Sequence, residues 1–184
     1  MSRKHSQPVG PELARPIELH HLEDGEERFE TIAAGPEECA ALAGRFGLES
    51  LERLEADVRL LRRGTQVLAE ADVVADAVQT CVVSLDPVPV HLRFRFTQLF
   101  DPDVRESGEF DELLDVEDDD PPEPLVNDTV DIGEMVAERF GLELDPYPRK
   151  PGATVDPRYL APEEAPQEDD AKPHPFAALK RLKQ

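Results

Sequence analysis

Alternating hydrophobic and polar residues predict a sheet in the first half of the chain. Between residues 54 and 60 the hydrophobic positions alternate with charged ones, which is typical of a half-buried strand. Residues 62–65 include a glycine and predict a turn. The same alternation continues over residues 67–78 and again over residues 88–100. Because the connections are too short for parallel crossovers, we expect an antiparallel meander.

Helical periodicity occurs in two places, residues 36–46 and residues 131–140. In the first, Pro36 occupies a favourable first helical position, and Gly47 suits the residue after the last turn. Both segments place their hydrophobic residues on one side, as in helices that pack on a sheet. We therefore expect the helices to cover one face of the meander.

The second helix has its own start and stop signals. Asp131, followed three residues later by Glu134, resembles a capping box, and Gly141 is a candidate stop. Together these elements predict an α+β fold, in which an antiparallel sheet that can curl toward a barrel packs against two main helices. A flexible acidic loop and a disordered C-terminal tail complete the expected architecture.

The segments outside these elements predict the domain organisation. Residues 1–16 are polar and contain three prolines, so we expect a flexible arm before a single domain over residues 17–148. Within that domain, residues 101–128 hold 13 acidic residues and predict a mobile loop. Residues 149–172 are rich in proline and acid and predict a disordered linker. Residues 173–184 form a short basic amphipathic segment.

This basic segment is a candidate binding element. It is too short to form a stable helix alone in water, so we expect it to become ordered on binding a partner protein or RNA. Its apolar positions recur every three residues, and its basic residues fall on the other side: Phe176, Leu179 and Leu182 against Lys180, Arg181 and Lys183.

The net charge of −21 opposes direct binding of nucleic acid by the chain as a whole. One interpretation is that the acidic residues bind a basic protein, and the other is that they only keep the protein soluble. Contact with RNA would need a local basic patch. Arg59, Arg93 and Arg95, together with residues 62–63, form such a patch if the first and third strands lie close together. The alternative is that these arginines pair with Glu55, Glu70 and Asp72.

Catalytic motifs are absent from the sequence. There is no phosphate-binding glycine loop, no dinucleotide fingerprint and no histidine pair at metal-ligand spacing. We therefore expect no catalytic residue, no cofactor and no small-molecule substrate. The chain has no apolar run long enough to span a membrane, and its first residues lack the apolar region of a secretory signal. These features predict a cytoplasmic protein that does not bind membranes.

Two cysteines are too few for a disulfide framework. The neighbours of Cys81 in the sequence offer neither a base nor a cause for a lowered pKa, so we interpret it as a buried strand cysteine. Cys39 lies on the apolar face of the first helix, and we interpret it as a core residue.

Four motifs in order resemble a known family. They are Cys81–Val88, Asp131–Glu138, Leu142–Pro148 and Pro175–Leu179. In this order they resemble the YceD family, whose members are linked to accumulation of the 23S RNA of the large ribosomal subunit, and the chain looks most like the alphaproteobacterial branch. The resemblance implies a role in large-subunit biogenesis and no known catalytic activity. Its motif residues here are Cys81, Leu85, Pro87, Pro146 and Pro148.

The chain departs from that resemblance at a cysteine pattern suggestive of zinc. Many family members have a second cysteine where this chain has Ser84, and further thiols where Arg149, Lys150 and Gly152 stand. A tetrahedral zinc site needs four nitrogen or sulfur ligands. We therefore predict that this protein binds no zinc, and metal analysis showing stoichiometric zinc would contradict that prediction.

The leading hypothesis is a non-enzymatic factor that supports 23S RNA accumulation. Its expected partner is a large-subunit ribosomal protein or a pre-ribosomal particle, with the segment Phe176–Lys183 contacting protein or rRNA. Direct RNA binding by the arginines of the sheet is the alternative. An RNA-processing enzyme is a third hypothesis, disfavoured because the acidic residues concentrate in sequence that looks flexible.

Overall fold

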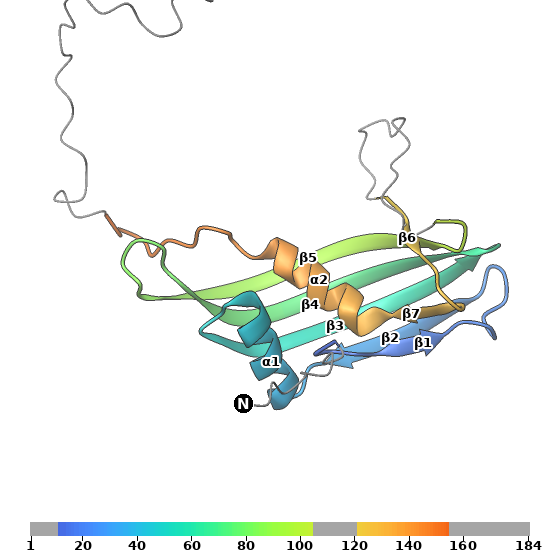
Figure 1. Cartoon of the computed structure of the whole chain (residues 1–184), viewed down its shortest axis with the longest axis horizontal. Helices are drawn as coiled ribbons and strands as arrows, with labels where there is room; N and C mark the ends of the chain where they lie inside the picture. Colours follow the sequence, from blue (N-terminus) through green and yellow to red (C-terminus); the bar gives the residue numbers. More distant parts are fainter. Residues whose placement is uncertain (1–10, 105–120, 155–184) are drawn as a thin grey trace, which may run out of the picture. The chain divides into compact units, whose positions relative to one another are not determined.

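Three long antiparallel strands form the centre of the protein (Figure 1). The computed structural model describes residues 11–104 and 121–154. Its main sheet has the order β2-β3-β4-β5-β6, in which β6 is parallel to β5 and the other neighbours are antiparallel. The strands are β2 (Glu27–Ala33), β3 (Ser50–Arg63), β4 (Gln66–Thr80), β5 (Pro87–Asp101) and β6 (Glu123–Pro124). The predicted meander is confirmed, but the sheet is open, so closure toward a barrel does not occur.

One face of the sheet is buried, as the alternation predicted. Along β4 the buried residues come at every second position, from Val67 to Ala77, and several of them are alanines. The intervening positions of β4, among them Glu70 and Asp72, belong to the opposite face. Small side chains on the buried face let a helix approach the sheet closely, so β4 lies at the centre of the core.

Both helices lie over the buried face (Figure 1). They are α1 (Pro36–Phe46), which packs on β3, and α2 (Ile132–Glu143), which contacts β4. α1 begins and ends where predicted, since Gly47 follows it with a φ of 65°, a conformation that glycine adopts without strain. Within the described residues, neither helix has the length and apolar character needed to cross a membrane.

Asp131 is the N-cap of α2, as predicted. Its carboxylate accepts hydrogen bonds from the backbone N–H groups of Gly133 and Glu134, both at 3.1 Å, and of Arg15 at 2.8 Å. The second half of the expected capping box is wrong, because Glu134 forms an ion pair with Arg45 at 2.7 Å. The cap therefore joins α2 to a segment 116 residues earlier in the chain.

Gly141 does not end α2, which continues to Glu143. A Cβ atom at this position would lie 2.5 Å from the ring of Phe46 at the end of α1. The ring of Phe46 also meets that of Phe140 edge-on at a centroid distance of 5.6 Å. This glycine therefore serves helix packing, and the stop signal was misinterpreted.

Two segments predicted to be loose contribute to the core. Residues 11–16 belong to the expected arm, yet Leu13 is fully buried, and β1 (Pro16–Glu18) pairs with β7 (Thr129–Asp131). The last part of the expected acidic loop also packs, because Leu125 is buried and β6 pairs with the end of β5. Single apolar residues hold both segments in place, and such residues create no periodic pattern in the sequence.

Replacing Asp131 with alanine should lower the free energy of unfolding by about 2 kcal/mol, since the cap and its link to Arg15 are both lost. Urea denaturation followed by circular dichroism measures this loss. Asp131→Asn keeps an acceptor oxygen and should lose less than half as much. Equal losses in the two variants would show that the charge, and not the hydrogen-bond geometry, stabilises this helix start.

Candidate functional site

Two loops meet at one end of the sheet (Figure 1). One joins β4 to β5, and the other follows α2. The N–H of Val82 donates to the carbonyl of Pro148 at 2.9 Å, and the ammonium of Lys150 lies 3.1 Å from the carboxylate of Asp86. We call residues 81–86 and 146–150 the Cys81 knuckle. The knuckle, with the first residue of β5, contains the five motif residues Cys81, Leu85, Pro87, Pro146 and Pro148.

The thiol of Cys81 lies at the centre of the knuckle. It is fully buried and follows the last residue of β4, so it is a buried cysteine but not a strand residue. Its sulfur accepts the backbone N–H of Lys150 at 3.3 Å and that of Ser84 at 3.4 Å. These donors, with Lys150 contributing most, lower the pKa of Cys81 to about 6. The prediction from its sequence neighbours alone was therefore wrong, because the main donor is 69 residues away.

The pKa of the other thiol, Cys39, shifts in the opposite direction. Cys39 is buried on α1, as predicted, and burial raises its pKa. Its sulfur lies 3.7 Å from the carbonyl of Ala34. At neutral pH we therefore expect a thiolate at Cys81 and a neutral thiol at Cys39.

Ultraviolet thiolate absorbance should show one titration, with a midpoint near pH 6, in a Cys39→Ser variant. The pKa of Cys81 is lower in the folded than in the unfolded chain, where it is about 8.5. Thiolate formation therefore adds stability progressively as the pH rises from about 6 to about 8.5, and that stability is lost as the pH falls back through this range to the folded pKa of about 6. Urea unfolding over this range, compared with Cys81→Ser, measures the effect. A midpoint near the unfolded value would contradict the hydrogen-bonded thiolate.

Large apolar side chains project from the knuckle into solvent. Leu85 is 76% exposed, Tyr147 is 71% exposed, and Val82, in the same loop as Leu85, is also exposed. Leu85 has a φ of 61°, which is unfavourable for a residue with a side chain. Hydrogen bonds from Cys81 N to Asp86 O and from Leu85 N to Cys81 O hold this backbone in place. Exposed apolar side chains on a fixed backbone are typical of a protein-binding surface.

The arginines of the sheet do not form a common basic face. Arg59 contacts Glu70 at 2.6 Å and Glu27 at 3.0 Å, and Arg95 contacts Asp72 at 2.6 Å. Strand β4 lies between β3 and β5 and supplies Glu70 and Asp72. The condition for a patch, that the first and third strands lie side by side, is therefore not met. The alternative expectation is confirmed for Glu70 and Asp72, while Glu55 contacts Arg53 at 3.8 Å, an arginine outside the expected patch.

Arg93 is on the same face of the sheet, opposite Val74 on β4. It has no ion pair among the residues that the structure describes. Arg62 does not contribute to the expected patch either, because its guanidinium forms an ion pair with the carboxylate of Asp128 at 2.7 Å. The remaining candidates for partner or RNA binding are outside the described residues: Phe176, Leu179, Lys180, Arg181 and Lys183.

The described residues do not fit a zinc ion at the knuckle. Cys81 supplies one sulfur, while Ser84, Lys150 and Gly152 supply neither a thiol nor an imidazole. In the ranges 11–104 and 121–154, no group of three or more histidine, cysteine or acidic residues is arranged for a metal ion. The sulfur of Cys81 instead accepts hydrogen bonds from two backbone N–H groups.

A family model described as "Large ribosomal RNA subunit accumulation protein YceD" matches residues 69–183, more than half of the chain. The chain belongs to the YceD family. Comparisons with curated proteins and with solved structures found no match. The matched part of this YceD protein includes most of β4, all of β5 and α2, and both loops of the Cys81 knuckle.

Membership of the YceD family implies involvement in accumulation of the RNA of the large ribosomal subunit. The family description names no reaction. The motif in the sequence identified Cys81 and Leu85 but missed Val82 and Tyr147. Tyr147 stands between the two prolines of the later motif, and that position was the available signal.

Proposed function

We propose that this YceD protein supports 23S RNA accumulation as a non-enzymatic binding protein, with a large-subunit ribosomal protein or a pre-ribosomal particle as its partner. The observation that carries the proposal is the Cys81 knuckle, where Leu85 and Tyr147 are exposed on a backbone fixed by hydrogen bonds. A few anchor residues, with tyrosine prominent among them, dominate the affinity of protein interfaces.

The charges favour a protein over RNA as the direct partner. The chain has a net charge of −21, and Arg59 and Arg95 are already paired with carboxylates. An arginine in an ion pair must lose that partner before it neutralises a phosphate. Ribosomal proteins, by contrast, are basic as a class, and an acidic surface speeds their encounter with this protein.

A tagged pull-down from growing cells, with and without RNase, tests the proposal. We expect large-subunit proteins to remain bound after RNase treatment. The double variant Leu85→Ser/Tyr147→Ser should lose most of them, since two exposed anchors are removed while the fold stays intact. Val126→Ser, at an exposed position away from the knuckle, is the matched control.

Two results would overturn the proposal. The first is recovery of rRNA and all its proteins only without RNase, which would favour direct RNA binding through Arg93 or the segment Phe176–Lys183. The second is equal recovery with wild type and the double variant, which would remove the knuckle from the interface. Circular dichroism of both variants checks that the fold is unchanged.

A further inference from the structure

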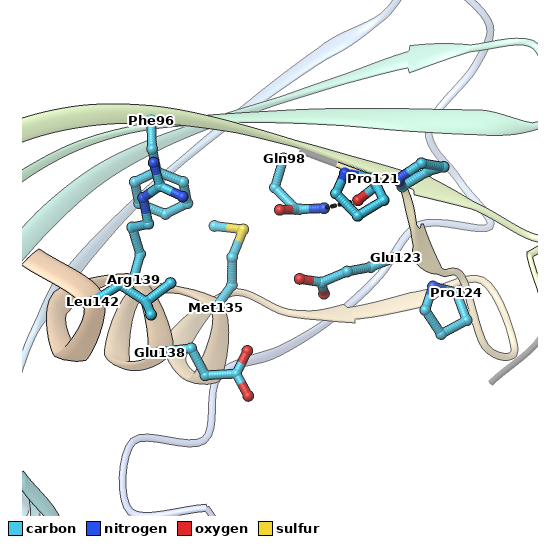
Figure 2. A pocket seen from close by; sticks show the side chains of 10 residues that line it. Phe96, Gln98, Pro121, Glu123, Pro124, Met135, Glu138, Arg139 and Leu142 are labelled. Carbon is cyan, nitrogen blue, oxygen red and sulfur yellow. Dashed lines mark hydrogen bonds between the residues drawn. The ribbon is translucent and has the colours of Figure 1, made fainter. Parts of the chain in front are cut away.

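A groove lies between α2 and the edge of the sheet (Figure 2). Its volume is about 310 Å³. Phe96 on β5 and Met135 on α2 form its floor, and both are almost fully buried. Pro121 and the exposed Leu142 stand at its margins, and the side-chain amide of Gln98 donates to the carbonyl of Pro121 at 3.2 Å. The groove is therefore mainly apolar and of a size that takes one or two side chains.

Two carboxylates flank this apolar floor. Glu123 reaches across the groove toward Met135, and Glu138 lies on α2 one turn after Met135 (Figure 2). Neither has an ion pair among the residues that the structure describes. Burial and the neighbouring charge of Glu138 raise the pKa of Glu123. A cation between the two carboxylates would replace this repulsion with attraction.

The groove also has a cation of its own, Arg139. Arg139 places its guanidinium over the ring of Phe96, 5.6 Å from the ring centroid, and lies 3.6 Å from the carboxylate of Glu143. Among the described residues that line it, the groove therefore combines an apolar floor with two carboxylates, Glu123 and Glu138, and one guanidinium.

We propose that this groove binds a basic amphipathic segment of the partner protein, with an apolar side chain on Phe96 and Met135 and a lysine or arginine between Glu123 and Glu138. The argument is charge complementarity around an apolar floor. This inference rests on the proposed function, because it assigns a second contact to the same protein partner. An apolar anchor with an adjacent cation is also how amphipathic helices bind grooves in other proteins.

The composition of the chain allows a direct test with the full-length protein. It contains two methionines, Met1 and Met135, and no tryptophan. Methyl-labelled methionine therefore gives one signal from the groove and one from the first residue. The probe is an amidated peptide of about 14 leucine and lysine residues with a single tryptophan, long enough to form a helix on binding. Its fluorescence reports affinity, and the Met135 signal reports the site.

We expect the peptide to shift the Met135 signal, and Glu123→Gln/Glu138→Gln to weaken its binding about tenfold or more. The control Glu37→Gln/Glu52→Gln removes the same charge at exposed positions away from the groove, and it should weaken binding less than about twofold. If the groove variant and the control variant weaken peptide binding equally, the proposal is overturned, since the peptide would then be attracted only by the general acidity of the protein. An unshifted Met135 signal would also overturn it.

The same spectra separate this proposal from its alternatives. If Phe176→Ser/Leu179→Ser moves the Met135 signal without peptide, the groove takes the chain's own C-terminal segment, and the proposal is wrong. If the peptide shifts Met135 as expected while the pull-down recovers no ribosomal protein, the groove's binding of a basic amphipathic segment is confirmed, but the proposed function and its ribosomal partner fail. If ribosomal proteins are recovered equally with wild type and the groove variant, the function stands and the groove has no part in it.

Discussion

Gly133→Ala should lower the free energy of unfolding by about 3 kcal/mol or more, the upper end of the range for overpacked positions. A Cβ atom at Gly133 would lie 1.8 Å from the carbonyl oxygen of Leu13 and 2.9 Å from its carbonyl carbon. Backbone atoms cannot rotate away as the end of a side chain can. The N-terminal segment must therefore move, and its movement also breaks the bond from Arg15 N to Asp131. For a protein of ordinary stability this is a large fraction of the total.

Gly44→Ala is the matched control for this variant. Gly44 lies within α1, and a Cβ atom there would meet nothing within 4 Å. Alanine should raise the free energy of unfolding by about 0.5–1 kcal/mol, because it restricts the unfolded chain. Urea denaturation of wild type and the two variants measures both changes in the free energy of unfolding, the expected decrease for Gly133→Ala and the expected increase for Gly44→Ala. A small loss for Gly133→Ala would show that the segment around Leu13 is not held against α2.

The parts of the fold that the sequence predicted are those with long periodic patterns. β3, β4 and β5 each run for 14 or 15 residues, long enough for alternation to appear many times. The ends of α1 were predicted because Pro36 and Gly47 are local signals. β1, β6 and β7 contain two or three residues each, so no period is visible in them. Their pairing depends on buried single residues such as Leu125.

The candidate site was predicted only in part, because its contacts are distant in the sequence. The motif identified Cys81 and the two prolines, but the lowered pKa of Cys81 depends on an N–H 69 residues later. In the same way, pairing of Arg59 with Glu70 depends on strand order, which alternation does not determine. The groove at Met135 was missed entirely, because its two carboxylates come from β6 and α2. Each of these features requires the tertiary fold.

Leu13→Ala should lower the free energy of unfolding by about 2–5 kcal/mol, as for other fully buried leucines. Leu13 is 0% exposed and belongs to the main core cluster, although the polar, proline-rich sequence around it predicted a flexible arm. Alanine would leave a cavity between this segment and α2. Leu142→Ala makes the same chemical change at a residue that is 76% exposed, and it should change stability by less than about 0.5 kcal/mol.

The comparison of Leu13→Ala with Leu142→Ala separates the loss of a buried contact at the start of α2 from the loss of an exposed side chain near its end. At the start of α2, Leu13, Arg15 and Asp131 form one connected unit, in which the chain before β1 covers the helix N-terminus. Losses for Leu13→Ala and Gly133→Ala should therefore be less than additive in the double variant, because each disturbs the same contact. Thermal and urea denaturation of the single and double variants measure this coupling. Full additivity would mean that the two residues stabilise the fold independently, and that the N-terminal segment packs on α2 through other contacts.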